Sequence, residues 1–406
     1  MADVPAADPP TADPPSCQAG CGRRGRACGV VAATLLRVVL LLACLAPACG
    51  PRRSGTHHVI VVLVDTLRHD ALGCYGNPWR STPHIDALAA EGVRFDQAIS
   101  SSGWTLPAVA SLFTGAWPQI HGGLGKDVVL TPIRDEIPTA AEVFRAAGFN
   151  TIGLANAAFV SPLLRLDRGF DVFDHRYAYN WEIRRADETI DEALRLIRAR
   201  GKGSSFVFIH LFDPHLDYDP PPEYATRFTR GRHEPTPPLS WQACQDLRRE
   251  GGQPPTTDDL EYVGQVYLGE VGFIDAQIGR LVDELRGLGL YERTTLVITS
   301  DHGEEFWDHG GFEHGHTLYD ELIRIPLILK PASGFVPVRR VVDEQVRIID
   351  VMPTVFDLLE IDPPETFEGV SLLPLVQGRQ TVERPAFGEG TLYGADKLCW
   401  RTSRYK

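Results

Sequence analysis

The chain has 406 residues and a formal net charge of −13, with 43% hydrophobic and 23% charged residues. This composition supports a full hydrophobic core and excludes global disorder. The acidic balance argues against non-specific binding to nucleic acid or anionic lipid, which both require basic surface, so we expect no nucleic-acid partner. An anionic substrate stays open, because a bound cation can reverse the local field of one cleft.

The first 49 residues differ in composition from the rest of the chain. Residues 1–27 begin with Pro, Ala and Asp and continue into an arginine-rich stretch, which predicts a disordered extension. Within residues 28–49, the uninterrupted apolar run 38–48 has the length of a signal-peptide core and is short for a membrane span. Segments ending at Cys44 and Cys49 resemble bacterial lipoprotein processing sites. A signal peptide, a lipoprotein signal and a membrane anchor all stay open. We expect export to the periplasm or cell envelope, and two of the three readings attach the N-terminus to the membrane.

Buried strands and helices alternate through the rest of the chain. Apolar runs rich in β-branched residues predict strands at 58–65, 205–210, 294–299 and 326–330. Helical periodicity predicts helices at 85–91, 108–114, 138–147, 186–200 and 262–287. This alternation predicts an α/β fold, a mostly parallel sheet with helices on both faces. Residues 216–259, rich in Pro, Asp and Arg, are interpreted as a surface excursion over one edge of the sheet.

Acidic residues and a histidine follow two of the predicted strands. Asp65 ends the first strand, and Asp301 and His302 end the strand at 294–299. In open α/β sheets ligands bind outside the carboxyl ends of the strands, so these side chains are expected to converge. Two carboxylates and one imidazole suit Ca²⁺, Mg²⁺ or Mn²⁺, with Zn²⁺ also open. For Asp65 taken alone, capping of the next helix is the competing interpretation.

Thr105 stands two residues before Pro107, at the start of a helical pattern. Proline in the first turn favours helix initiation, which places Thr105 near a helix N-terminus. An anionic ester is stabilised in that position. The competing interpretation is that Thr105 is an ordinary N-cap.

Several blocks of the sequence resemble the sulfatase family of the alkaline phosphatase superfamily. In the family's own order, these blocks are 62–76, 82–95, 104–115, 213–215, 300–304, 314–319, 324–327, 349–354 and 369–374. The resemblance implies an alkaline-phosphatase-like fold with a catalytic domain at 56–375. It also implies a small C-terminal antiparallel sheet, which 376–406 would form only in part because relatives run on further.

The resemblance also assigns roles to individual residues. One divalent cation would be held by Asp65, Asp301 and His302 together with Thr105, the position of the family's nucleophile. His215 would contact the ester oxygens. At the place of a family lysine, His314 is the nearest catalytic counterpart, with one residue of extra spacing, and His316 is its rival as a substrate-binding residue. Asn156 lies where the family has a Gly-Lys-Trp-His segment, and there it would donate a neutral hydrogen bond to substrate.

The departures from the family pattern bear on the reaction. Sulfatases carry Cys or Ser in a Cys/Ser-x-Pro-Ser-Arg signature that is converted to formylglycine, whereas this chain has Thr105 and, in place of the arginine, Val109. Relatives with a threonine nucleophile act on phosphorus. The sequence therefore predicts a metal-dependent hydrolase or transferase for phosphate or phosphonate esters of small molecules, glycans or lipids.

Two alternatives stay open beside this prediction. One is a sulfuric ester hydrolase, arylsulfatase-like, of low activity. The other is a catalytically inactive sulfatase-like binding protein, because the arginine and lysine positions of the family are lost. The sequence makes no prediction of oligomeric state.

Overall fold

The structure is a computed structural model that describes residues 55–127, 129–175, 184–199, 203–229, 255–379 and 383–406. The predicted extension at 1–27 and the export or anchor segment at 28–49 lie outside these residues, as does the stretch 230–254 of the predicted excursion. Among the helices of the described ranges, none combines the length and the apolar character that crossing a membrane requires.

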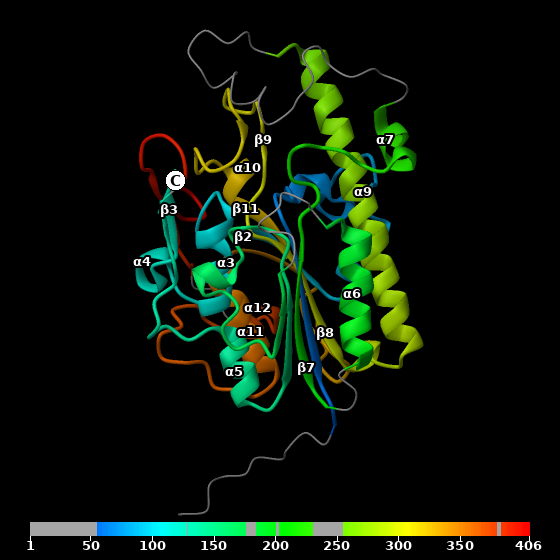
Figure 1. Ribbon diagram of the computed structural model, residues 1–406, viewed down its shortest axis with the longest axis vertical. Helices are drawn as coiled ribbons and strands as arrows, with labels where there is room; N and C mark the ends of the chain where they lie inside the picture. Colours follow the sequence, from blue (N-terminus) through cyan, green and yellow to red (C-terminus); the bar gives the residue numbers. More distant parts are fainter. Residues whose placement is uncertain (1–54, 128, 176–183, 200–202, 230–254, 380–382) are drawn as a thin grey trace, which may run out of the picture. The chain divides into compact units, whose positions relative to one another are not determined.

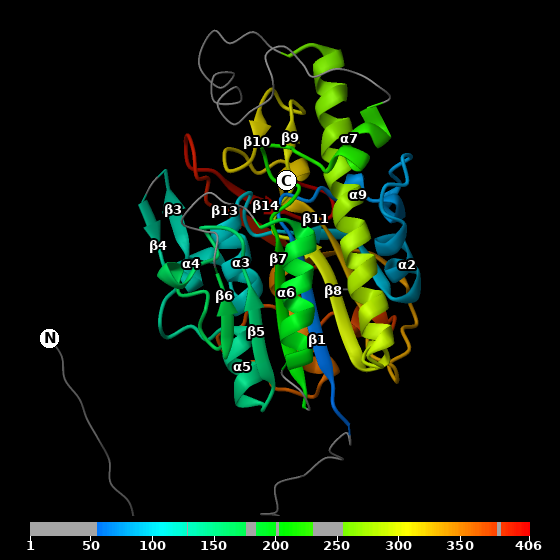
Figure 2. The ribbon, with the colours of Figure 1, turned by 45° about the vertical axis from the view of Figure 1, so that its right-hand side comes forward.

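Within the described residues, one central sheet has eight strands in the order β12-β2-β11-β8-β1-β7-β5-β6. Strand β11 runs antiparallel to both of its neighbours, and the other pairs of the sheet are parallel. The central position of β1 between β7 and β8 is visible in Figure 2. The strands of this sheet are β1 (His58–Val64), β2 (Val93–Ile99), β5 (Asn150–Leu154), β6 (Val172–Asp174), β7 (Ser205–Leu211), β8 (Thr294–Ser300), β11 (Arg324–Lys330) and β12 (Val341–Arg347).

Helices cover both faces of the sheet (Figures 1 and 2). One face packs against α3, α5, α11 and α12, and the other against α2, α6 and α9. The α-helices are α2 (Pro83–Glu91), α3 (Thr105–Thr114), α4 (Pro118–His121), α5 (Ala140–Ala146), α6 (Ala186–Ala199), α7 (Pro222–Thr229), α9 (Thr257–Gly287), α10 (Asp320–Ile323), α11 (Val351–Leu358) and α12 (Leu373–Val376).

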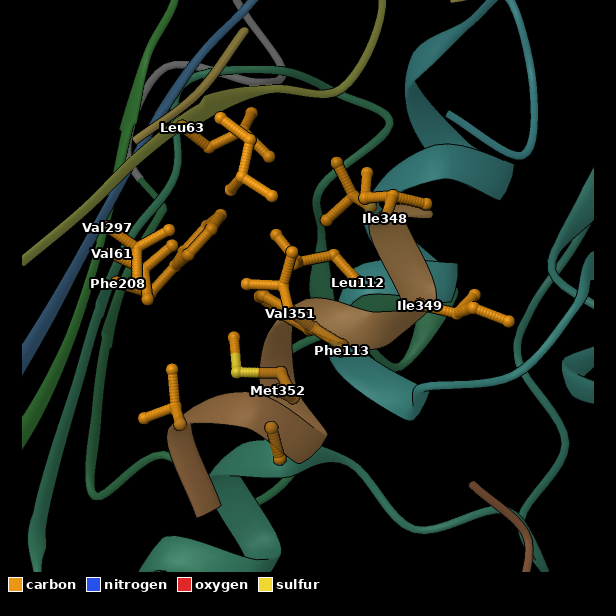
Figure 3. Packing of buried hydrophobic residues seen from close by; sticks show 14 of the residues in the cluster. Val61, Leu63, Leu112, Phe113, Phe208, Val297, Ile348, Ile349, Val351 and Met352 are labelled. Carbon is orange, nitrogen blue, oxygen red and sulfur yellow. The ribbon is translucent and has the colours of Figure 1, made fainter. Parts of the chain in front are cut away.

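Strand β1 is buried on both faces because successive side chains point to opposite sides of a strand. Val61 and Leu63 belong to the core under α3 and α11, whereas Val62 and Val64 belong to the core under α6 and α9. Figure 3 shows Val61 and Leu63 pointing from β1 toward the helices that carry Phe113 (α3) and Met352 (α11). Each such fully buried side chain contributes roughly 1.5–3 kcal/mol. This packing makes the strand ends a rigid platform.

Short antiparallel pairs extend from this framework. They are β3 (Leu124–Lys126) with β4 (Val129–Thr131), β9 (Glu305–Phe306) with β10 (Phe312–Glu313), and β13 (Ala386–Glu389) with β14 (Leu398–Arg401). The pair β13–β14 is the small C-terminal antiparallel sheet that the resemblance implies. It is joined to β12 by Gln345, whose Nε2 donates to the backbone oxygens of Arg384 and Arg401.

The predicted α/β fold and mostly parallel sheet are confirmed, with local differences. Helix α9 begins at Thr257, five residues before the prediction, because Thr256 and Asp259 form a reciprocal capping box. Helix α3 begins at Thr105 rather than Ala108. Strands β2, β5, β6 and β12 were not predicted from the sequence. Of these, β6 has only three residues, and β12 contains three consecutive polar residues at 343–345.

Candidate metal centre and active site

Asp65 follows β1 directly, and its backbone N–H donates to Leu211 O of β7 at 2.9 Å. The side chain is fully buried, and neither carboxylate oxygen has a hydrogen-bond partner of good geometry. Helix capping, the alternative interpretation of Asp65, is therefore wrong. His210 Nε2 lies 3.3 Å from Oδ2. Because Asn156 N donates to His210 Nδ1, a neutral His210 carries its proton on Nε2, facing this carboxylate.

Asp301 and His302 follow β8, which is the neighbour of β1 in the sheet. Asp301 Oδ1 accepts a hydrogen bond from His302 N at 2.9 Å, whereas the buried Oδ2 has no hydrogen-bond partner. His302 Nδ1 donates to Gly303 O at 2.9 Å, which leaves the lone pair of the neutral ring on Nε2. This nitrogen lies 3.3 Å from Asp301 Oδ2 and 3.5 Å from Asp65 Oδ1.

These three side chains fit a divalent cation. One ligand atom from each of Asp65, Asp301 and His302 lies within 4.8 Å of the others, and all three residues are buried. Three buried carboxylate oxygens, two on Asp65 and one on Asp301, make no hydrogen bond of good geometry, and their nearest side-chain neighbours are imidazole nitrogens at 3.3 to 3.5 Å. Buried carboxylates normally have stronger compensation than this, so the arrangement argues for an ion. Hard oxygen ligands with one nitrogen suit Ca²⁺, Mg²⁺, Mn²⁺ or Zn²⁺.

The protonation of the group reflects burial and crowding. Burial alone would raise the pKa of Asp65, but the imidazoles of His210, His215 and His302 outweigh burial and hold that pKa well below its usual range. Burial and the negative charge of Asp65 raise the pKa of Asp301. Burial opposes the charging of His302, yet the two carboxylates prevail and raise its pKa. Like charges held this close are relieved by a positive charge among them.

Thr105 is the first residue of α3, and its side chain is 2% exposed. The N-cap of α3 is Trp104, and the Thr105 hydroxyl makes no capping bond, so the N-cap interpretation is wrong. Instead, Oγ1 lies 3.3 Å from His302 Nε2. Trp104 Nε1 donates to Gly390 O at 3.0 Å and holds the start of the helix. Val109, at the position of the family's arginine, is fully buried in the apolar core.

Two further histidines form a row with His302. The ring of His314 lies 4.4 Å from that of His302 and 4.9 Å from that of His215, measured between centroids. His314 Nδ1 lies 2.9 Å from Glu304 Oε1, and Tyr218 donates its hydroxyl hydrogen to Glu304 Oε2 at 3.0 Å. His215 Nδ1 donates to the backbone at 2.7 Å, so Nε2 of the neutral ring has its lone pair available. Burial raises the pKa of Glu304 to about 7.

Two predicted substrate-binding residues lie in other hydrogen-bond networks. His316 Nε2 lies 2.8 Å from Glu305 Oε2. The Asn156 amide donates to Thr189 Oγ1 at 3.0 Å and to His210 O, and its oxygen accepts from Arg184 Nε at 3.0 Å. The structure thus brings Asp65, Thr105, His215, Asp301, His302 and His314 together, while the substrate-binding roles of Asn156 and His316 stay predictions.

The sequence analysis assigned no role to His210, Tyr218 or Glu304. A signal for His210 was present, because it interrupts the apolar run of β7 with a polar residue. Glu304 stands in the same sequence block as Asp301. Its position in the sequence indicated no role, and only its full burial in the structure draws attention to it. Tyr218 carries no comparable signal, since its contact with Glu304 spans 86 residues.

Comparison with known proteins places this geometry in a family. The model of the Sulfatase family matches residues 57–361. The "uncharacterized sulfatase YidJ" of Escherichia coli (strain K12) is 27% identical over 402 residues, covering 86% of this chain and 77% of that protein. An arylsulfatase of Clostridium perfringens (strain 13 / Type A) is 24% identical over 417 residues, covering 86% of both proteins.

A solved structure agrees with this placement at the level of the fold. The phosphonate monoester hydrolase of Agrobacterium radiobacter is similar with a TM-score of 0.68 and 21% identity, over 82% of this chain and 80% of that chain. At this identity the likeness shows the shared fold alone. Because the family model spans three quarters of the sequence, the chain belongs to the sulfatase family and is a hydrolase acting on ester bonds.

Proposed function

We propose that the protein is a metal-dependent hydrolase of phosphate or phosphonate esters in which Thr105 is the nucleophile. The observation that carries the proposal is the buried Thr105 hydroxyl, which lies 3.3 Å from His302 Nε2 and is not used for helix capping. A hydroxyl beside His302 is positioned for chemistry at the group that includes Asp65 and Asp301. A structural threonine would be expected to bond its own helix.

Asp65, Asp301, His302 and Thr105 are the residues that would hold the cation. When bound, the cation supplies a Lewis acid that lowers the pKa of the Thr105 hydroxyl and offsets charge on the ester oxygens. The N-terminus of the ten-residue helix α3 adds partial positive charge at the same place. Together these features favour an anionic ester over a neutral one.

His215 and His314 are the groups proposed to serve the leaving alcohol. Each uses its Nδ1 within the protein, His215 toward Leu216 O and His314 toward Glu304 Oε1. Nε2 of each ring is therefore the atom that would hold the proton given to the departing alkoxide. Thr105 Oγ1 would lose its proton to water as it forms a bond to phosphorus. The bond from phosphorus to the leaving oxygen would break, that oxygen would take the proton from the imidazole, and the phosphoryl group would stay on Thr105.

The hydroxyl nucleophile favours phosphorus over sulfur. A formylglycine hydrate can expel sulfate by collapsing to an aldehyde, and a sulfated threonine has no such exit. A phosphothreonine can be resolved by in-line attack of water, which restores the hydroxyl and releases the phosphoryl product. A phosphonate monoester hydrolase has a similar fold, which supports a phosphorus ester as substrate but says nothing of the nucleophile. The second candidate, slow sulfate ester hydrolysis, is favoured by the arylsulfatase relative.

Substitution of Thr105 tests the proposal. With a phosphodiester substrate, Thr105→Ala should lower kcat on the order of 10³-fold or more, because the nucleophile is removed. Thr105→Ser should retain part of the activity, since the hydroxyl remains. Thr131→Ala, on the exposed end of β4, is the matched control and should keep full activity.

Intact-mass analysis of quenched turnover separates the two candidate reactions. A phosphoryl-sized adduct on the peptide that contains Thr105 supports the proposal. Rapid turnover of an aryl sulfate by the unmodified chain, with phosphate and phosphonate esters inert, would overturn it in favour of sulfate ester hydrolysis. The inactive binding-protein alternative predicts that none of these esters is turned over and that Thr105→Ala changes nothing.

A further inference from the structure

A second group of metal-type ligands lies outside the site described above. One ligand atom from each of Glu305, His309 and Glu321 lies within 4.8 Å of the others. Glu305 is in β9, His309 is in the turn between β9 and β10, and Glu321 is in α10. The two carboxylate side chains are 1% and 7% exposed, whereas that of His309 is 44% exposed. The group therefore has a buried acidic floor and an imidazole at the surface.

The turn between β9 and β10 is shaped around Glu305. Its Oε1 accepts hydrogen bonds from His309 N at 3.0 Å and from Gly311 N at 2.8 Å, and its Oε2 lies 2.8 Å from His316 Nε2. A Cβ on Gly311 would come within 2.6 Å of His316 Nε2, so the chain passes closely over this pair. The position of the Glu305 carboxylate is thus fixed from several sides.

The orientation of the His309 ring is also fixed by its neighbours. Its ring stacks on Tyr319 with centroids 3.7 Å apart and planes at 9°. This stacking directs Nδ1 toward Glu321 Oε1, which lies 2.6 Å away. The stacking and the contact with Glu321 together fix the orientation of a half-exposed imidazole, which favours its use as a metal ligand.

The negative charges of Glu305 and Glu321 would be stabilised by a bound cation. With neutral imidazoles, the two buried carboxylates bring two negative charges within a few ångströms of each other. Buried carboxylates are otherwise paired or coordinated to metal, because desolvation makes an uncompensated charge costly. Hydrogen bonds from two backbone N–H groups and the contact with His316 stabilise the Glu305 carboxylate without changing its charge, and a divalent ion would balance both carboxylates.

We propose that Glu305, His309 and Glu321 bind a second divalent cation, and that the ion is of the zinc type. Two carboxylates and one imidazole are a ligand set that Zn²⁺ accepts, with a fourth position left for water. His316 would be an outer partner that orients the Glu305 carboxylate, as ligands commonly require. This assignment gives His316 a role other than contact with substrate.

The ion would join two segments that no long strand connects. Glu305 and His309 belong to the hairpin formed by β9 and β10, whose register comprises two residue pairs, and Glu321 belongs to α10. His314 follows β10 directly, and Glu304 precedes β9. A cation bound to Glu305, His309 and Glu321 therefore stabilises the hairpin from which the His314–Glu304 contact is made.

Zinc content tests the proposal independently of Thr105 and of catalysis. Bound zinc is measured by elemental mass spectrometry, after equilibration of untagged protein with Zn²⁺ and removal of free metal. An Asp65→Asn, Asp301→Asn double variant removes the first group's carboxylates and should retain about one zinc per chain. Adding His309→Ala should remove that zinc, whereas adding His84→Ala, on the exposed surface of α2, should leave it in place.

Two outcomes would overturn the proposal. One is the absence of bound zinc in the double variant, and the other is equal zinc content after His309→Ala and His84→Ala. If the double variant does not fold by circular dichroism, the wild type decides the matter. The wild type should bind about one zinc ion per chain more than Glu321→Gln does, whichever cation the first group holds. Equal content in the wild type and Glu321→Gln counts against the site.

Discussion

The strand-borne ligands and the hairpin-borne histidine are held in place in different ways. Asp65 and Asp301 follow β1 and β8, which pair over seven residues in the middle of the sheet. His314 follows β10, which pairs with β9 over two residues. The position of His314 depends on side-chain contacts with Glu304, and through Glu304 with Tyr218. Substitutions at the strand ends should therefore abolish activity, whereas substitutions around the hairpin should lower kcat only in part.

The largest expected effect comes from the strand-borne group. Asp301→Asn keeps the shape of the side chain and removes one negative charge from the candidate metal centre. We expect kcat to fall by about 10³-fold or more, and the catalytic cation to be lost, because a buried ligand is neutralised. Thermal unfolding of the metal-free variant should occur at no lower temperature than that of the metal-free wild type, since repulsion with Asp65 is relieved. Full activity with full metal content would contradict the assignment.

The same contrast explains which parts of the molecule could be predicted from the sequence. Strands β1, β7 and β8 are long apolar runs, so their carboxyl ends, and with them Asp65 and Asp301, were located from the pattern alone. Strands β9 and β10 have two residues each, which is too short for any periodicity. Edge strand β12 has three consecutive polar residues at 343–345, which break the alternation that would identify a strand.

Contacts across the chain were also beyond the sequence pattern. The pairing of His210 with Asp65 joins two strands 145 residues apart, and it became visible only when the register of β1 and β7 was known. Glu304 is fully buried, and its Oε2 accepts a hydrogen bond from Tyr218, which lies 86 residues earlier in the chain. Composition and spacing carry no information on such tertiary arrangements.

A matched pair of substitutions on one segment sharpens the comparison at an intermediate effect. His314→Gln should lower kcat by about 10²-fold, because the proposed proton donor to the leaving alcohol is lost while side-chain volume is kept. His316→Gln should lower kcat less than about tenfold, since His316 contacts Glu305 rather than the histidine row. Steady-state kinetics with one phosphodiester measure both. A larger loss for His316→Gln would exchange the two roles.

The smallest expected effect tests whether Tyr218 acts through the hairpin. Tyr218→Phe removes the hydrogen bond to Glu304 and keeps the edge-on ring contacts with Tyr267 and Phe306. A single hydrogen bond contributes about 0.5–1.5 kcal/mol, so kcat should fall roughly threefold to tenfold, with KM and metal content unchanged. A purely structural role would lower thermal stability and leave kcat of the folded enzyme as it was.

A double-mutant cycle decides between positioning and independent action of Tyr218. If Tyr218 acts by holding Glu304 against His314, Tyr218→Phe should have almost no further effect on kcat in a His314→Gln background. Additive losses would mean that Tyr218 reaches the reaction by another route. In an Asp301→Asn background the residual rate should still respond to Tyr218→Phe, because Asp301 accepts its hydrogen bond from His302 N whereas Tyr218 donates to Glu304. Coupling to Asp301 as strong as coupling to His314 would remove the distinction between the two regions.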